Sequence, residues 1–156
     1  MMKFVWVICS LLVGSSLISA SEMTGSDHPV KVYTSEETFE DLVENIKMAV
    51  VDQGLLVSGT LHVSDMLNRT ASDLGYSQVF LKAESVEFCS ALMSHKMSQA
   101  AAENISICPF TIAVYVKQSE PGKVYAAYRV PHLMGDGGEA TAEIINLFET
   151  ILEDAL

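Results

Sequence analysis

Two apolar stretches that flank a Pro-Gly turn constrain the fold of this chain more than any other feature. β-branched and aromatic residues dominate residues 111–116 and 124–128, as is typical of β-strands. Between them lies Glu120-Pro121-Gly122-Lys123, in which Pro followed by Gly favours a tight turn. Strands joined by so short a connection pair antiparallel. We therefore expect a β-hairpin at Val114–Val116 and Val124–Tyr128, with a sheet built around it.

Helical periodicity and capping residues predict four helices around that sheet. The segment from Thr34 to Glu37 has the composition of a capping box and precedes an apolar stripe at helical spacing, which Gly54 is suited to end. The other helices are expected between the cap Ser64 and Gly75, at Ala91–Glu103 after the cap Ser90, and after the run Gly135–Gly138.

Extended segments are expected between these helices, at Leu55–Val63 and Gln78–Phe88. The order is then helix, strand, helix, strand, helix, hairpin, helix, without an internal repeat. Such an order predicts an α+β fold, a single domain in which helices pack on a mainly antiparallel sheet.

The first twenty residues have the composition of a secretory signal peptide. Lys3 precedes an apolar run that ends in small residues at Ala20. A membrane anchor is the alternative, although a membrane span needs about 20 apolar residues. We expect cleavage after Ala20, an N-terminal arm at residues 21–33 and the α+β domain at residues 34–156, in an exported protein.

The acidic composition argues against some classes of partner. Twenty Asp and Glu residues stand against nine Lys and Arg, which gives a net charge of −11 at pH 7. A protein with this charge repels phosphate backbones and anionic lipid head groups. We therefore expect neither a nucleic acid nor an anionic membrane surface as a partner.

Cys89 and Cys108, the two cysteines outside the expected signal peptide, are the strongest candidates for chemistry. Two cysteines in an exported protein usually form a disulfide. Three interpretations are open: a structural disulfide, a functional pair that acts as redox couple, sulfur acceptor or ligand anchor, and two separate buried thiols. We expect the two cysteines to lie close enough to bond if the strands that carry them are neighbours.

The surroundings of Cys89 act on its thiol in opposite directions. Cys89 precedes an expected helix start, where unpaired N–H groups and the helix dipole lower the pKa of a thiol. Glu84 and Glu87 lie nearby in sequence, and their negative charge raises that pKa.

His132 and Met134 are weaker candidates, as ligands of a metal or haem, because they lie in a loop after the hairpin. Met93, His95 and Met97 carry groups that suit Cu(I). On one helix, however, His95 lies about 200° around from each methionine, so the three side chains cannot reach a single ion. The metal and any other cofactor stay unassigned.

Motifs of common enzymes are absent from the sequence. There is no G-x-S-x-G, no H-E-x-x-H and no dinucleotide-binding glycine fingerprint. The glycine-rich run before the last expected helix lacks the Lys-Ser/Thr ending of a phosphate-binding loop. No residue is assigned a catalytic role, and the sequence favours a protein that is not an enzyme.

Residues that match a known family occur at Val86–Ala91, Ile107–Tyr115 and Val124–Pro131. Together these segments resemble the domain of unknown function 302 family, with a similarity that extends roughly from Phe39 to Phe148. The resemblance implies a compact α+β domain, often self-associating, without an assigned reaction. A homodimer is therefore an open alternative.

The chain looks like the cysteine-bearing branch of that family, which is found in exported bacterial proteins. The more common family pattern has a Gly-Asn-Pro-like element where this chain has Phe88–Ala91, and Leu-Pro where it has Cys108-Pro109. Each departure introduces a cysteine. The resemblance implies a location in the bacterial periplasm.

Three hypotheses of function remain. The first is a non-catalytic module that holds a small ligand, a metal or a partner against the sheet. The second is a periplasmic thiol-disulfide or sulfur-carrier protein that uses Cys89 and Cys108. The third is a structural exported domain that a disulfide staples.

Overall fold

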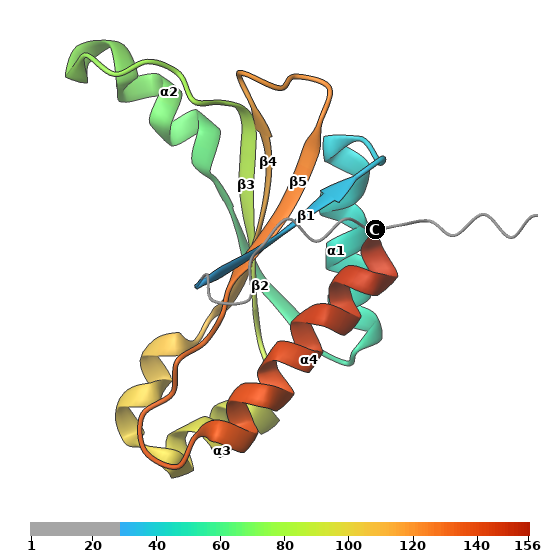
Figure 1. Ribbon diagram of the computed structural model, residues 1–156, viewed down its shortest axis with the longest axis vertical. Coiled ribbons are helices and arrows are strands. Elements are labelled where there is room, and N and C mark those ends of the chain that lie inside the picture. Colours follow the sequence, from blue (N-terminus) through green and yellow to red (C-terminus); the bar gives the residue numbers. More distant parts are fainter. Residues whose placement is uncertain (1–28) are drawn as a thin grey trace, which may run out of the picture.

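Five strands form one antiparallel sheet in the part of the chain that the structure describes, residues 29–156, in the order β1-β5-β4-β3-β2 (Figure 1). The structure is a computed structural model. In chain order the elements are β1 (Val30–Ser35), α1 (Phe39–Asp52), β2 (Leu56–His62), α2 (Val63–Leu74), β3 (Phe80–Cys89), α3 (Ala91–Ala100), the 3₁₀-helix η1 (Ala102–Ile107), β4 (Phe110–Lys117), β5 (Val124–Arg129) and α4 (Gly138–Ala155). The predicted α+β fold class is confirmed.

The β4–β5 hairpin is present as predicted. Its register pairs Val116 with Val124 next to the turn and Ile112 with Tyr128 farther along. Because residues alternate between the two faces of a strand, this register sends Ile112, Val114 and Tyr128 to the same face of the sheet.

The sheet begins earlier in the chain than the sequence indicated. Residues 30–33, which we assigned to the N-terminal arm, belong to β1, which pairs with β5 from Val30–Arg129 to Ser35–Val124. The cap of α1 shifts accordingly from Thr34 to Thr38, whose Oγ1 accepts a hydrogen bond from the Asp41 N–H at 3.2 Å. The expected signal peptide, residues 1–20, lies outside the described residues.

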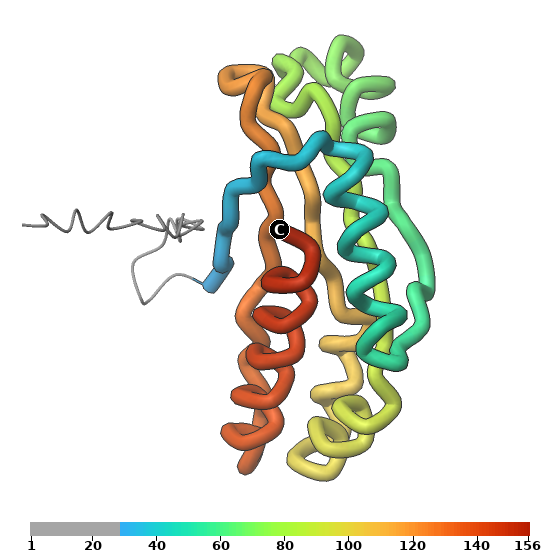
Figure 2. The backbone as a smooth tube through the Cα atoms, turned by 90° about the vertical axis from the view of Figure 1, so that its right-hand side faces the viewer, coloured from blue at the N-terminus to red at the C-terminus, as the bar shows by residue number. Residues whose placement is uncertain are grey.

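Helices α1 and α4 lie side by side on one face of the sheet (Figure 2). The apolar stripe of α1 is buried there as its periodicity predicted, through Phe39, Leu42, Val43, Ile46, Ala49 and Val50. No helix within residues 29–156 is long and apolar enough to span a membrane.

Phe148 of α4 packs against three neighbouring strands. Its ring centroid lies 5.7 Å from that of Phe88 on β3, 5.7 Å from Phe110 on β4 and 4.4 Å from Tyr128 on β5. All four rings are almost completely buried. Each such aromatic pair contributes about 0.5–1.5 kcal/mol beyond the burial of its surface, so this cluster fixes α4 on the sheet.

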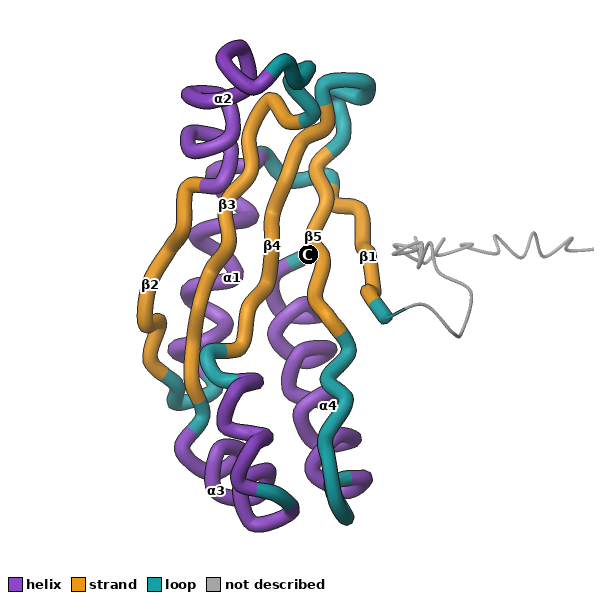
Figure 3. The backbone as a smooth tube through the Cα atoms, turned by 90° about the vertical axis from the view of Figure 1, so that its left-hand side faces the viewer, coloured by secondary structure: helices purple, strands orange, loops and turns teal. Residues whose placement is uncertain are grey.

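The opposite face of the sheet carries no helix, as Figure 3 shows with the strands in front of α1 and α4. On β4 this open face receives the alternate residues Thr111, Ala113, Tyr115 and Lys117. Helices α2 and α3 lie at opposite ends of the sheet (Figures 1 and 3).

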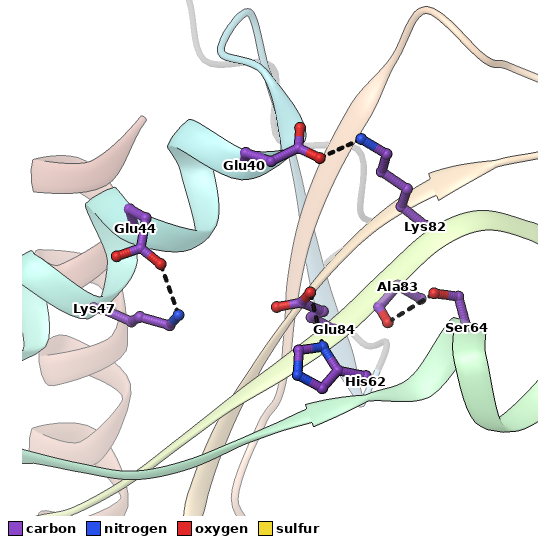
Figure 4. A network of polar contacts seen from close by, with 8 residues as sticks. All are labelled: Glu40, Glu44, Lys47, His62, Ser64, Lys82, Ala83 and Glu84. Carbon is purple, nitrogen blue, oxygen red and sulfur yellow. Dashed lines mark hydrogen bonds and ion pairs between the residues drawn. The ribbon is translucent and has the colours of Figure 1, made fainter.

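Helix α2 is only loosely attached to the domain. It begins at Val63, so Ser64 lies inside the helix and not at its cap, and the Ser64 hydroxyl donates to the carbonyl of Ala83 at 3.4 Å (Figure 4). Gly75 ends the helix as predicted, at φ = 72°, in the left-handed region that favours glycine. Its apolar residues Met66, Leu67 and Leu74 are exposed.

The expected helix at 91–103 is divided. Ser90 caps α3 as predicted, with its hydroxyl accepting a hydrogen bond from the Met93 N–H at 3.3 Å. Helix α3 ends at Ala100, and η1 follows after Ala101, whose backbone is extended. The chain therefore turns before it enters β4.

A partly buried carboxylate also joins α4 to the sheet. Glu149 accepts hydrogen bonds from Lys31 and Tyr33 of β1 and from Tyr128 of β5, each at 2.5 Å. Burial alone would raise the pKa of Glu149, but the three donors outweigh it, and the pKa is lowered. The pKa of Tyr128 is raised by burial and by its bond to Glu149.

The variant Glu149→Gln should therefore be less stable by about 1–2 kcal/mol, because it loses charge-assisted hydrogen bonds and leaves two tyrosine hydroxyls with a weaker acceptor. Denaturant unfolding measures the difference. Glu143→Gln on the same helix is the control: its partner Lys96 is more exposed, so the loss should stay below about 0.5 kcal/mol. Equal losses in both variants would contradict a special role for Glu149.

Acid should weaken the same contact. A carboxyl group whose pKa is lowered by folding stabilises the fold above its ordinary pKa, and that contribution is lost as the pH falls through the folded value. The free energy of unfolding of the wild type should thus decline below about pH 4.5, and Glu149→Gln should decline less steeply. Parallel declines in both proteins would exclude Glu149 as a source of the acid sensitivity.

Candidate functional site

A cavity of about 550 Å³ lies at the end of the sheet where β4 begins and β5 ends. It is lined by Val30 of β1, Ser106 and Ile107 of η1, Pro109, Phe110, Thr111 and Ala113 at the start of β4, Ala127, Tyr128 and Arg129 at the end of β5, Val130, Pro131 and His132 after it, and Phe148 of α4. Strands, η1, the loop after β5 and one core helix thus all contribute.

Two alanines leave room for this cavity on the sheet. Ala113 of β4 and Ala127 of β5 are register partners, and both alternate with residues that face the core. A larger side chain at either position would occupy the space above the strands. Phe110, Tyr128 and Phe148, which line the cavity, also belong to the core cluster.

The segment after β5 is held in place by Asn104 of η1, which is only 2% exposed. Its amide donates to the carbonyls of Met97 at 2.9 Å and Met134 at 3.1 Å, and its oxygen accepts from the Met134 N–H at 2.8 Å. The buried Asn104 side chain therefore links η1 both to α3 and to the loop that contains Met134.

Gly135 lets this loop approach α3 closely. Its φ is +68°, and a Cβ atom placed on it would lie 2.3 Å from the carbonyl oxygen of Ala100. Any other residue would meet backbone atoms there and would adopt an unfavourable backbone conformation. Gly135 does not line the cavity, but this contact fixes the loop whose earlier residues Val130, Pro131 and His132 do.

The structure separates the two loop candidates. His132 lines the cavity, whereas Met134 does not and is 59% exposed. The backbone of Met134, and not its thioether, makes the contacts with Asn104.

Cys89 and Cys108 lie beside one another at the foot of the sheet, next to the cavity. Their strands β3 and β4 are neighbours, both cysteines are free thiols, and Cys108 lies close enough to Cys89 to raise its pKa. Cys108 also accepts a hydrogen bond from Ser94 Oγ at 3.9 Å. Its neighbours Ile107 and Pro109 both line the cavity.

The opposing influences on the Cys89 thiol end in a raised pKa. Burial, the hydrogen bond and charge of Cys108, and the charge of Glu87 raise the pKa of Cys89 to about 11. At neutral pH the thiol is protonated and a weak nucleophile.

The helix α3 does not gather copper ligands. Met97 is fully buried and Met93 packs against the core, while His95 is exposed. Leu92 on the same helix is 59% exposed. Among the described residues no three His, Cys, Asp or Glu side chains are grouped so that they could hold a metal ion.

Sequence reasoning missed the cavity and, with it, Arg129. The hairpin was evident, but the pairing of two alanines depends on the register, and η1 and the loop after β5 are brought together by Asn104. One signal was available: Arg129 is one of only two arginines in a strongly acidic chain.

Cys89 should react slowly with iodoacetamide in the folded protein. A pKa raised from 9.0 to about 11 lowers the thiolate fraction at pH 7.5 about 100-fold. Peptide mapping by mass spectrometry measures the rate at each cysteine, with the denatured protein as the reference. A folded-state rate for Cys89 equal to the denatured rate would contradict the raised pKa.

Comparisons with known proteins agree with this fold. The crystal structure titled "uncharacterized conserved protein DUF302 from Bacillus stearothermophilus" matches 82% of this chain and 98% of its own, with a TM-score of 0.66 and 14% sequence identity. No curated protein gives a significant match. Residues 31–155 match the family described as "Domain of unknown function DUF302". The chain therefore belongs to the DUF302 family.

Proposed function

We propose that this domain is a non-catalytic binding module that holds a small ligand in the cavity, against the open face of the sheet. The observation that carries the proposal is the cavity itself, which combines alanine and aromatic surface with a few polar groups. Its volume of about 550 Å³ falls within the range of small-molecule sites, about 300–1,000 Å³. Such sites are mainly apolar, with few polar groups that orient the ligand.

The preformed wall supports the same function. Asn104 and Gly135 do not line the cavity, but they fix the loop against α3 and so restrain the lining residues Val130, Pro131 and His132, which precede that contact, before a ligand binds. Less ordering on binding leaves more of the interaction energy as affinity.

A thiol-disulfide or sulfur-carrier function has weaker support. Both functions need a thiolate that attacks, and the Cys89 thiol is protonated near neutral pH. The contact between Cys89 and Cys108 instead favours a disulfide that staples the fold.

We propose further that the protein is exported to a bacterial periplasm after cleavage of a signal peptide at Ala20, and that Cys89 and Cys108 are bonded there. Formation of this disulfide releases two protons and two electrons to an oxidant, such as the disulfide of a periplasmic oxidoreductase. The resulting bond would join Cys89, the last residue of β3, to Cys108, which is separated from β4 by one residue.

Protein purified from the periplasm under non-reducing conditions should contain the Cys89–Cys108 disulfide, visible as one linked peptide pair. Reduction should lower the free energy of unfolding by about 3 kcal/mol, because the bond closes a loop of nineteen positions. The double variant Cys89→Ser, Cys108→Ser is the control and should not respond to reduction. Free thiols at both positions in periplasmic material would contradict the staple.

Filling the cavity should abolish ligand binding. Ala113→Leu places a larger side chain above the sheet, and ligand-observed NMR with a mixture of aromatic and aliphatic fragments should detect binders to the wild type that this variant loses. The matched control is Ala142→Leu at an exposed position of α4, which should keep them. Equal binding to both variants would place the fragments elsewhere and contradict the proposed site.

A further inference from the structure

We infer that the cavity selects small organic anions, with the negative group on Arg129 and the apolar body over Ala113 and Ala127. This inference rests on the proposed function and names the ligand class of the same site. It follows from the distribution of charge around the cavity.

Arg129 is one of two basic residues that form no ion pair in the described part of the chain. Residues 29–156 contain eight Lys and Arg side chains, and six of them pair with a carboxylate: Lys31, Lys47, Lys82, Lys96, Lys117 and Lys123. Within the same residues, Arg69 on α2 and Arg129 at the cavity form no ion pair. In so acidic a chain, an arginine without a carboxylate partner is available to an anion from solution.

No acidic side chain belongs to the lining of the cavity, and Glu149, which accepts a hydrogen bond from the lining Tyr128, is already paired with Lys31. Arg129 and His132, in contrast, both line the cavity.

On the neighbouring strand β3, Glu87 is the register partner of the lining residue Thr111. The Glu87 carboxylate points toward Gly59 on β2: a Cβ atom added to Gly59 would lie 3.4 Å from one of its oxygens. Strand β2 lies on the other side of β3 from β4 and β5, so this carboxylate points away from Arg129.

The chemistry of the lining indicates an organic anion. The guanidinium of Arg129 offers a planar set of donors that matches a carboxylate or sulfonate. Ala113, Ala127, Ile107, Pro109 and Phe110 offer no donor or acceptor from their side chains and favour an apolar body. A fully hydrated inorganic ion would gain little from them.

Three probes with the same ring system test the inference: naphthalene-2-carboxylate, the neutral naphthalene-2-carboxamide and the cationic naphthalen-2-ylmethylammonium. Isothermal titration of the full domain should show the carboxylate binding about tenfold or more tightly than the amide, as one charge-assisted interaction allows. The cation should bind weakest. Added salt should weaken the carboxylate more than the amide.

Two arginine variants assign the preference. Arg129→Gln should remove the difference between carboxylate and amide, because the positive charge that distinguishes the two probes is gone. Arg69→Gln removes the other unpaired arginine and should leave the preference intact. Circular dichroism confirms that both variants are folded.

The outcomes separate the inference from the proposed function. If carboxylate and amide bind equally, or if Arg129→Gln keeps the preference, the anion inference is wrong, while binding that Ala113→Leu abolishes still supports a ligand site. If none of the three probes binds, the anion inference is wrong, and the proposed function is then decided by the fragment binding that Ala113→Leu should abolish.

Discussion

The packing of Phe148 against three strands is the contact on which the other features depend. This single side chain sets the distance of α4 from β3, β4 and β5, and Glu149, the next residue, then meets the donors on β1 and β5. Phe148 also lines the cavity, together with Phe110 and Tyr128. The core and the candidate site therefore share a wall, and a change in one is felt in the other because protein interiors are closely packed.

The acidic charge of the chain and the character of the cavity are complementary. Six of the eight basic side chains in residues 29–156 are paired with carboxylates, which leaves Arg69 on α2 and Arg129 at the cavity. Under the proposal made above, an anion is repelled by most of this surface and attracted at the cavity. Such a contrast gives selectivity for where a ligand binds, even when the affinity of the isolated contact is modest.

The sequence predicted correctly those features that depend on residues only a few positions apart. They are the apolar stripe of α1, the cap Ser90, the helix end at Gly75 and the Pro121-Gly122 turn. Strand β1 was missed because its pairing partner lies at the far end of the chain. The cavity was missed because Ala113 is informative only once the register of the hairpin places Ala127 opposite it.

Within residues 29–156, strand β1 pairs only with β5, so the first strand of the chain cannot join the sheet until the last strand is available. Val30 meets Arg129 only after the intervening helices and strands have been synthesised, so the contact order of the fold is high and its folding slow relative to a bundle of local contacts. A chain that leaves the ribosome N-terminus first can complete neither the sheet nor the Phe148 cluster until nearly all of it has emerged. Under the export proposed above, this topology would postpone folding until passage of the unfolded chain is almost complete.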